Sequence, residues 1–295
     1  MTHIVCVGDV MVDVLAQLPG PLAVGSDTPA PISFRGGGAA ANVAAWAAAA
    51  GATATFVGRL GDDPLGRRVA AELGGLGVDV RVVFDGERAT GTCIVLVDPS
   101  GERTMIPSAG ANDAPVELAT LPPTADWLYL SGYALFAAGA RQAARDALAA
   151  ARERSWSIAV DAASAAPLAA VGADAFVDWL GEDITLFANE DEAHVLTGLA
   201  EPDAAAGALA RRVGQAVVKL GAAGAIWSDG THSCRSAALQ VPVVDTTGAG
   251  DAFAAGYLGT PGDPAARLTG AAQLAARAVG TVGGRPSGGE LRGDA

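Results

Sequence analysis

The regular alternation of apolar, strand-like runs and alanine-rich helical runs constrains the fold more than any other feature of the sequence. From about residue 113 onward, short runs such as "WLYLSG", "SIAVD", "DITLFA" and "QAVVKLG" alternate with helical runs such as "AAGARQAARDALAAARERS". Parallel strands need crossover helices, so this alternation predicts an α/β fold with a mostly parallel sheet covered on both faces. Ligands of such sheets bind at the carboxyl ends of the strands.

The first part of the chain has a different pattern. "IVCVGDVMVDVLA" is typical of a buried strand that continues into a second extended piece, and the run at 36–51 predicts a glycine turn followed by a helix. The runs "RVVFD" and "GTCIVLVDPSGERTMIP" are β-rich and lack helical periodicity. They predict a small sheet that stands off the main body. In the second half of the chain, "GAIWSDGTHSCRS" at 224–236 predicts a hairpin.

Charge and cysteine content exclude several classes of function. The formal net charge is −13 and the chain has no run of Lys or Arg, so nucleic acid is not expected as a partner. The 3 cysteines are widely spaced, which indicates neither a disulfide framework nor a metal cluster and favours the cytoplasm. No signal peptide and no membrane-spanning run is expected.

One stretch, "VVDTTGAGDAFAAGYL" at 243–258, is expected to carry chemistry. We expect a strand that ends near Asp245, a turn, and a helix that begins near Gly250. Gly248 and Gly250 let the backbone approach a ligand, and the free N–H groups at the helix start form an anion pocket. The helix dipole is expected to keep Asp251 ionised at neutral pH, so a substrate hydroxyl is expected between Asp251 and the anion. A simple N-terminal helix cap is the alternative for Asp251.

Four segments together resemble the signatures of the ribokinase-like, or PfkB-type, carbohydrate kinases. "DTTGAGDAFAAGYL" is similar to the C-terminal signature, "RGGGAAANVAAWAAAAGA" to the N-terminal signature, "NEDEAHVLTG" to the Asn-x-x-Glu motif, and "VVKLGAAGAIW" to the nucleotide-side strand and turn. They follow the family's order and span nearly the whole chain. The resemblance implies a ribokinase-like, three-layer α/β/α fold with a mostly parallel central sheet and a small β-sheet lid.

The resemblance also implies an organisation and an activity. It implies an α/β nucleotide-binding core of residues 1–11, 36–79 and 112–295, and a β-rich lid of residues 12–35 and 80–111 that covers the substrate. Family members often form a homodimer through their lids. The implied reaction uses ATP and Mg²⁺ and moves the γ-phosphate to a hydroxymethyl group of a small sugar or sugar acid.

Site residues are implied for each part of this reaction. Asp251 would act as the base, while the backbone N–H groups of Gly248, Ala249 and Gly250 would hold the γ-phosphate. On the nucleotide side, Asn189 and Glu192 would guide Mg²⁺, mostly through water, although their spacing equally suits a helix-capping box. Further nucleotide contacts are implied for Lys219, Gly221 and Gly224.

The sugar side and a cation loop complete the implied site. Sugar contacts are implied for Asp13, Gly37, Gly38 and Asn42. Asp245 and Thr247 resemble part of a monovalent-cation loop, where K⁺ would organise the turn; a turn-capping acid is the alternative for Asp245. From the lid, Arg35 and Arg103 could meet an anionic sugar, although the surface is the simpler expectation for both.

Departures from the family pattern leave the substrate open. Ribokinase has Asn where this chain has Met11, and its Gly-Gly-Lys-Gly is replaced by "GGAA" at 37–40, which puts ribose in doubt. The "SG" pair at 131–132 is similar to that of 2-keto-3-deoxygluconate kinases, but "VDAASAA" lacks their Asp-x-Asn-x-Arg pattern.

Three other functions compete with that of a sugar kinase. A nucleoside kinase, adenosine- or pseudouridine-like, would need an aromatic stacking partner, for which the candidates are Phe34, Tyr133 and Phe136. A non-catalytic sugar-binding relative is disfavoured by the intact Asp251 turn. A dinucleotide oxidoreductase is disfavoured because no Gly-x-Gly-x-x-Gly follows the first strand.

Overall fold

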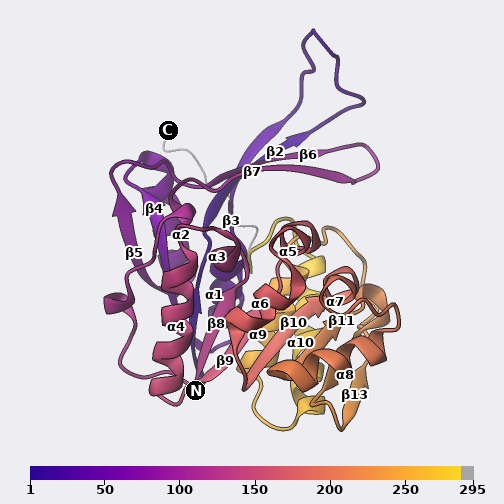
Figure 1. Ribbon diagram of the computed structural model, residues 1–295. Helices are drawn as coiled ribbons and strands as arrows, with labels where there is room; N and C mark the ends of the chain where they lie inside the picture. Colours follow the sequence, from indigo (N-terminus) through magenta and orange to yellow (C-terminus); the bar gives the residue numbers. More distant parts are fainter. Residues whose placement is uncertain (287–295) are drawn as a thin grey trace.

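A twisted nine-stranded sheet forms the centre of the molecule in the computed structural model, which describes residues 1–286 (Figure 1). Seven neighbouring strands run parallel, and the last two, β12 and β13, pair antiparallel as the expected hairpin. The strand order across the sheet is β13 (Ser233–Ser236), β12 (Ala225–Ser228), β11 (Gly214–Lys219), β10 (Ile184–Asn189), β9 (Ser157–Asp161), β8 (Trp127–Ser131), β1 (His3–Val7), β4 (Thr53–Gly61) and β5 (Asp79–Asp85).

Helices cover both faces of this sheet, which confirms the expected three-layer α/β/α fold. One face carries α1 (Ala39–Ala49), α2 (Pro64–Gly75), α9 (Ala249–Gly259) and α10 (Pro264–Val279). The other carries α3 (Tyr133–Phe136), α4 (Arg141–Glu153), α5 (Ala165–Val171), α6 (Ala173–Leu180), α7 (Glu190–Thr197) and α8 (Pro202–Val213). Short 3₁₀ turns occur at Gly110–Asp113, Leu118–Thr120 and Gly221–Ala223.

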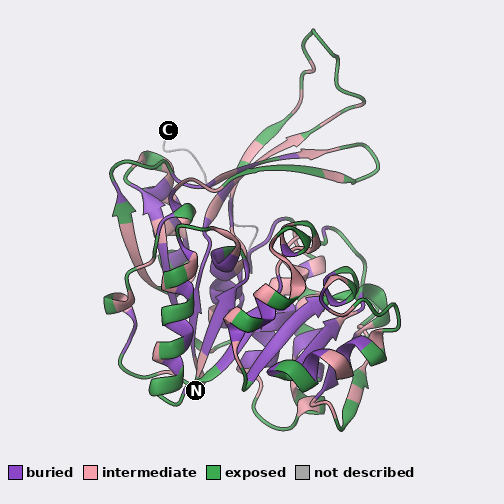
Figure 2. Ribbon diagram, in the orientation of Figure 1, coloured by how far each residue is buried: buried purple, intermediate pink, exposed green. Residues whose placement is uncertain are grey.

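The central strands are mostly apolar because both of their faces are buried (Figure 2). In β1, Ile4 and Cys6 face the core under α1, α9 and α10, whereas Val5 and Val7 face the core under α4 and α8. Among the described residues, no helix is both long and apolar enough to traverse a lipid bilayer.

A separate four-stranded sheet, here called the lid, projects from the body (Figure 1). Its order is β3 (Ile32–Gly37), β2 (Met11–Gln17), β6 (Thr92–Val97) and β7 (Arg103–Ser108). The expectation that the lid includes everything from residue 80 is wrong for β5, which pairs in parallel with β4 at the edge of the main sheet. A half-exposed edge strand of the core has the same alternating pattern as a lid strand, so the sequence did not separate them.

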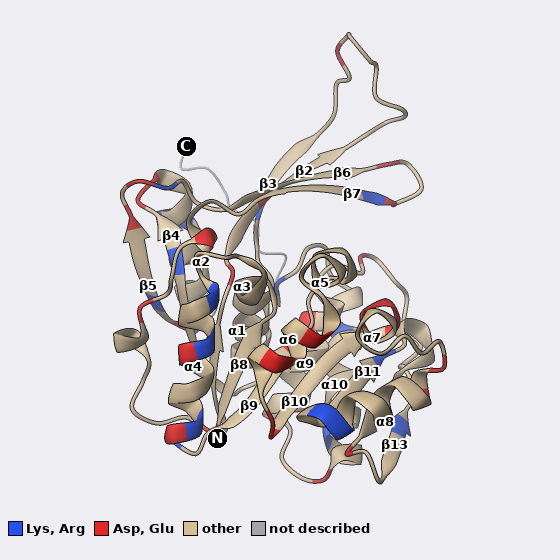
Figure 3. Ribbon diagram, viewed as in Figure 1, with Lys and Arg blue, Asp and Glu red and all other residues tan. Residues whose placement is uncertain are grey.

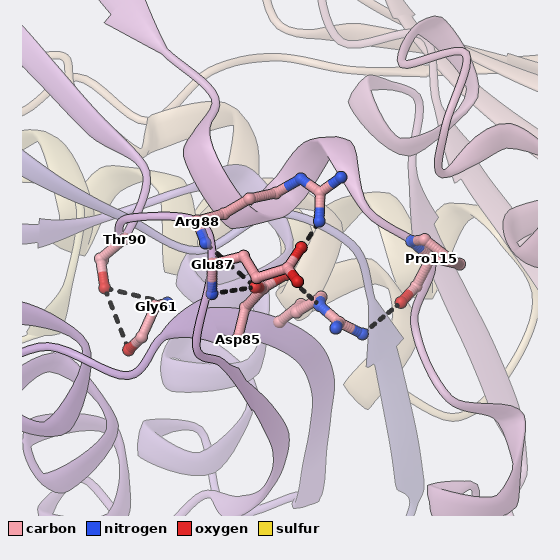
Figure 4. A network of polar contacts seen from close by, with 7 residues as sticks. Gly61, Asp85, Glu87, Arg88, Thr90 and Pro115 are labelled. Atoms are coloured by element: carbon pink, nitrogen blue, oxygen red, sulfur yellow. Dashed lines mark hydrogen bonds and ion pairs between the residues drawn. The ribbon is translucent and has the colours of Figure 1, made fainter.

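The connection from β5 to lid strand β6 is anchored at its base by the carboxylate of Asp85 (Figure 4). Asp85 Oδ1 accepts from the backbone N–H groups of Glu87 and Arg88 at 2.8 and 3.0 Å, and its Oδ2 accepts from Arg59 Nε at 2.9 Å. Thr90 Oγ1 accepts from Gly61 N at 3.1 Å. The lid therefore begins from a fixed point on the core.

The strand expected before Asp245 does not form. Residues 237–248 contain neither strand nor helix, and α9 begins at Ala249. Val243 and Val244 are exposed, and this segment is joined to α10 through the N–H groups of Val244 and Asp245, which both donate to Val279 O. An apolar run forms a strand only where a neighbouring strand supplies hydrogen bonds, and β13 ends the sheet before this segment.

Candidate active site

The carboxyl ends of the parallel strands gather polar side chains at one edge of the sheet, next to the start of α9. This edge is where ligands of open α/β sheets bind. Just after or at the ends of β1, β8, β9, β10 and β11 lie Asp9, Ser131, Asp161, Asn189 and Lys219.

Asp251, in the first turn of α9, is held by a buried chain of hydrogen bonds. Asn42 Nδ2 on α1 donates to Asp251 Oδ2 at 2.9 Å, and Asn42 Oδ1 accepts from Arg285 Nε at 3.1 Å. Arg285 is fully buried; it donates to Gly37 O at 2.7 Å and pairs with Glu72. Asp251 Oδ1 has no hydrogen-bond partner within residues 1–286 and remains available to a ligand.

The ionisation of Asp251 differs from the expectation. Burial raises the pKa of Asp251 to about 7, with the charges of Asp161 and Asp9 adding to the rise, while the hydrogen bond from Asn42 and the charge of Lys219 oppose it. At neutral pH Asp251 is therefore only partly ionised, because removal from water outweighs the helix dipole that favours its ionised form.

Lys219 places a positive charge beside the turn that precedes α9. Its ammonium donates to Asp161 Oδ2 at 2.7 Å, and the ion pair raises the pKa of Lys219 although burial alone would lower it. An ideal Cβ on Gly250 would lie 3.5 Å from Nζ of Lys219. The ammonium therefore lies against the backbone of the expected anion pocket.

The turn itself keeps backbone donors open. Gly248 has φ +73°, and the residues 248–250 are partly exposed. Ala249 N donates over 3.3 Å to Thr246 O, but the N–H groups of Gly250 and Asp251 donate to no acceptor in the described part of the chain. These free donors at a helix start are suited to an anion.

Asn189 and Glu192 form a complete capping box at the start of α7. Asn189 Oδ1 accepts from Glu192 N at 2.8 Å, while Glu192 Oε2 accepts from Asn189 N at 2.8 Å and its Oε1 from Asn189 Nδ2 at 2.9 Å. Burial and the charge of Asp161 raise the pKa of Glu192 to about 7, against the effect of Lys219.

Asn189 and Glu192 are not arranged to coordinate a metal directly. Both oxygens of Glu192 are engaged by Asn189, and among residues 1–286 no cluster of His, Cys, Asp or Glu is arranged to hold a metal by itself. The neighbouring carboxylates of Glu192 and Asp161 do suit a hydrated Mg²⁺, which keeps several of its waters.

Asp13 lies on the lid strand β2, against the glycine turn that precedes α1. A Cβ on Gly37 would lie only 2.4 Å from Asp13 Oδ2, and one on Gly38, which has φ +93°, would lie 2.6 Å from Val10 Cα. Both glycines are therefore required for this close approach. Burial raises the pKa of Asp13 to about 6, with Arg285 and Arg103 opposing and Asp9 reinforcing the rise.

A cavity of about 240 Å³ lies between the lid and the turn at Gly248. The register of the lid puts one face of the sheet over it. The residues that line it are Asp13, Leu15, Arg35, Val95, Arg103, Met105, Thr247, Gly248, Gly283 and Gly284.

A second hollow, of about 300 Å³, lies at the amino ends of β8–β11. Ligands of this kind of sheet bind at the carboxyl ends of the strands, so this hollow is at the wrong edge for a ligand.

Asp245 joins three separate segments of the chain. Its Oδ1 accepts from Thr247 N at 2.7 Å and pairs with Arg103 of the lid, and its Oδ2 accepts from Gly283 N at 2.9 Å. Although burial acts in the opposite direction, these donors lower the pKa of Asp245 to about 2. The turn-capping alternative for Asp245 is confirmed.

The glycines expected on the adenosine side shape the turn after β11. Gly221 has φ +54° and Gly224 has φ +100°; a Cβ on Gly224 would lie 1.9 Å from Ser236 O, whereas one on Gly221 would meet nothing within 4 Å. Gly224 is thus required by packing, and Gly221 leaves open space beside Lys219.

Three residues of this site were missed or undervalued in the sequence. Asp161 carried a usable signal, since it ends an apolar strand at the ligand-binding edge. Arg285 in the glycine-rich tail carried none. Arg103, expected at the surface, lines the cavity and reaches Asp245.

Known proteins resemble this chain over most of its length. The family model described as pfkB family carbohydrate kinase matches residues 1–286. The chain is 31% identical over 273 residues to a fructokinase of Escherichia coli, covering 85% of this chain and 81% of the relative. It is 32% identical over 271 residues to a 2-dehydro-3-deoxygluconokinase of Thermoproteus tenax, covering 87% and 81%.

A solved structure gives the same result for the fold. Aminoimidazole riboside kinase from Salmonella enterica, complexed with aminoimidazole riboside and an ATP analog, matches with a TM-score of 0.81 at 26% identity. The match covers 99% of this chain and 97% of that chain.

Proposed function

The chain belongs to the pfkB family of carbohydrate kinases, which use ATP, and from this premise we propose that it transfers the γ-phosphate to a hydroxymethyl group of a small sugar or sugar acid. One observation carries the proposal. Asp251, with a pKa of about 7 and a free Oδ1, lies at the start of a helix whose first N–H groups are open and beside which Lys219 is fixed.

Asp251 acts as the general base in this proposal. Its Oδ2 is held by Asn42, so Oδ1 accepts the proton of the substrate hydroxyl as the oxygen attacks the γ-phosphorus and ADP leaves. A pKa near the working pH is the best compromise between being deprotonated and being basic enough. Such a base contributes about 10²–10⁴-fold to the rate.

The turn at 248–251 and Lys219 neutralise the phosphoryl group during transfer. Phosphoryl transfer requires positioning and charge stabilisation more than covalent help from the protein. The N–H groups of Gly250 and Asp251 and the ammonium of Lys219 are fixed before the reaction, so they need no reorganisation when the charge moves. Asp161 keeps Lys219 in that position.

Mg²⁺ is the divalent cation that we propose for the nucleotide side. It would neutralise part of the negative charge of the nucleotide phosphates. Glu192 and Asn189 would hold it through water, and Asp161 supplies a second carboxylate nearby.

A sugar or sugar acid as acceptor is supported by the lining of the cavity. Its volume of about 240 Å³ is below the roughly 300 Å³ at which pockets for drug-sized ligands begin. Among the described residues that line it there is no aromatic side chain on which a base could stack. The carboxylate of Asp13 can accept from two neighbouring hydroxyl groups.

A nucleoside acceptor is the second candidate. The match to aminoimidazole riboside kinase favours it. Tyr133 also favours it, because this aromatic residue lies near the acids of the site: burial and the charges of Asp9, Asp161 and Asp251 raise its pKa to about 12. The other two stacking candidates lie elsewhere: Phe34 is on the outer face of the lid, and Phe136 packs against Phe176.

ADP release over a panel of sugars, sugar acids and nucleosides tests the proposal. Turnover of sugars or sugar acids is expected, whereas turnover confined to nucleosides would select the second candidate. Asp251→Asn should then lower kcat by about 10²–10⁴-fold while nucleotide still binds. Asp178→Asn, which changes an exposed acid on α6, should leave kcat unchanged. A near-normal kcat for Asp251→Asn would contradict its role as base.

We also propose that two copies pair through the outer face of the lid. Few residues of the four lid strands are charged (Figure 3), and those that are, Asp13, Arg35 and Arg103, all line the cavity. The opposite face carries an apolar group that crosses the sheet and whose members are 39–62% exposed: Ile32, Phe34, Ile94 and Ile106. A second copy offers the same apolar surface and would remove both from water.

A further inference from the structure

The carboxylate of Asp245 is the point where the lid, the catalytic turn and the C-terminal segment meet. Arg103 is the first residue of lid strand β7, and its guanidinium pairs with Asp245 Oδ1. Thr247 N and Gly283 N bind the same carboxylate. The pair is well removed from water, with 24% of the Arg103 side chain and 5% of the Asp245 side chain exposed.

This arrangement does not suit a monovalent cation at Asp245. The guanidinium already balances the charge of the carboxylate, and the two N–H groups already use both of its oxygens. A K⁺ ion would have to displace Arg103 or lie beside its positive charge. The first change would leave the partly buried guanidinium without its counter-charge, and the second would bring like charges together in a poorly hydrated site.

We infer that Arg103 is a positioning residue that does for this turn what a bound monovalent cation would otherwise do. Asp245 orients Thr247 N, and the next residue, Gly248, begins the turn that precedes α9. Fixing Asp245 therefore fixes the direction of the N–H groups that face the phosphoryl group. The inference rests on the proposed function for its kinetic part only.

The origin of Arg103 in the lid gives the contact a second consequence. Arg103 also lines the cavity over Gly248, so the sheet that covers the acceptor is the same one that pairs with Asp245. Opening the lid breaks the pair and leaves Asp245 without its counter-charge. The turn is thus fully ordered only when the lid is closed over the acceptor, which disfavours transfer of the phosphate to water.

The first test compares the wild-type protein in KCl, NaCl and tetramethylammonium chloride at equal ionic strength. We expect kcat to differ by less than about twofold between the salts and the thermal midpoint to be the same in all of them, since Arg103 already balances the charge of Asp245 that a cation would balance. A strong activation by KCl, or a thermal midpoint raised by KCl alone, would overturn the inference.

Arg103→Met supplies the complementary test, because it removes the charge and keeps much of the side-chain length. We expect kcat to fall by about 10- to 100-fold, with part of the loss restored by KCl but not by tetramethylammonium chloride. Arg103→Lys should retain more activity than Arg103→Met. Arg235→Met, which breaks an exposed ion pair with Asp203, is the matched control and should behave as wild type in every salt.

Two outcomes separate this inference from the proposed function. If no member of the substrate panel is phosphorylated, the proposed function fails, but the thermal midpoint still reports on Asp245: KCl should raise it for Arg103→Met and not for wild type. If substrates are phosphorylated and Arg103→Met keeps wild-type kcat in all salts, the inference fails alone.

Discussion

At the scale of single residues, the site works by setting the proton affinity of one carboxylate. Asp251 is removed from water and has other acids nearby, while Asn42 and Lys219 limit the rise of its pKa to about 7. A fully exposed carboxylate would be a much weaker base, and one without Asn42 and Lys219 would remain protonated at neutral pH.

The activity should therefore depend on pH in a defined direction. The base is active when deprotonated, so kcat/KM should rise with pH, reach half of its maximum near pH 7, where half of Asp251 in the free enzyme has lost its proton, and level off at higher pH. Initial rates at limiting sugar from pH 5 to 9 measure this. A kcat/KM that is constant down to pH 5 would contradict a base with this pKa.

Replacing Asn42 should move that profile. Asn42→Ala removes a hydrogen bond that favours the ionised carboxylate, so the midpoint of kcat/KM should shift to higher pH. Glu192 and Asp13, with pKa values of about 7 and about 6, titrate in the same range, but they accept no hydrogen bond from Asn42. Gln142→Ala, which breaks an exposed hydrogen bond on α4, should leave the midpoint unchanged.

At the scale of elements, the junction before α9 depends on the backbone rather than on side chains. Gly248 has φ +73°, and a Cβ there would lie 2.4 Å from Gly284 O. The chain can make this turn only where no side chain is present.

Gly248→Ala should therefore impair both stability and catalysis. We expect a loss of about 1–3 kcal/mol in the free energy of unfolding, from backbone strain and overlap, and a decrease in kcat as the N–H groups turn away. Urea unfolding and ADP release measure the two effects. Gly259→Ala, at the other end of α9 with open space around its Cβ, is the control and should not lower either.

The start of α7 combines a structural and a proposed catalytic role in the same residues. Asn189→Ala removes the cap and should cost about 1 kcal/mol of unfolding free energy, whereas Asn189→Ser keeps a good cap and should cost little. If the pair also holds hydrated Mg²⁺, both variants should need more Mg²⁺ for half-maximal activity. An unchanged Mg²⁺ requirement in Asn189→Ser would leave capping as its only role.

At the scale of the whole molecule, the lid has two faces with different tasks. The inner face is charged and covers the cavity, and the outer face is apolar and open. The connection from β5 to the lid is held to the core at Asp85 (Figure 4).

Phe34→Asp tests whether the outer face joins two copies. The variant places a charge in the apolar group, so it should shift a dimer to monomer in light scattering after size-exclusion chromatography, with the thermal midpoint of the core retained. Leu199→Asp is the control: Leu199 is an apolar residue outside the lid, after α7, with the same exposure of 39% as Phe34, and its change should leave the assembly unchanged. A wild-type protein that is monomeric at high concentration would contradict the proposed pairing.

The sequence by itself determined the features that depend on neighbouring residues. The alternation of strands and helices gave the mostly parallel sheet, residues three apart gave the capping box at α7, and two glycines and an acid gave the turn before α9. The strand before Asp245 and the lid boundary at β5 were misjudged, because a strand is defined by the strand it pairs with.

Only the tertiary structure decided how the site is held and charged. Asn42 meets Asp251 across 209 positions of sequence, Arg103 meets Asp245 across 142, and Arg285 meets Asn42 across 243. No local pattern predicts such pairs, because they form only when separate elements pack together. The pKa of Asp251 follows from the same cause: burial is a property of the packed molecule, and it outweighs the helix dipole that the local sequence indicates.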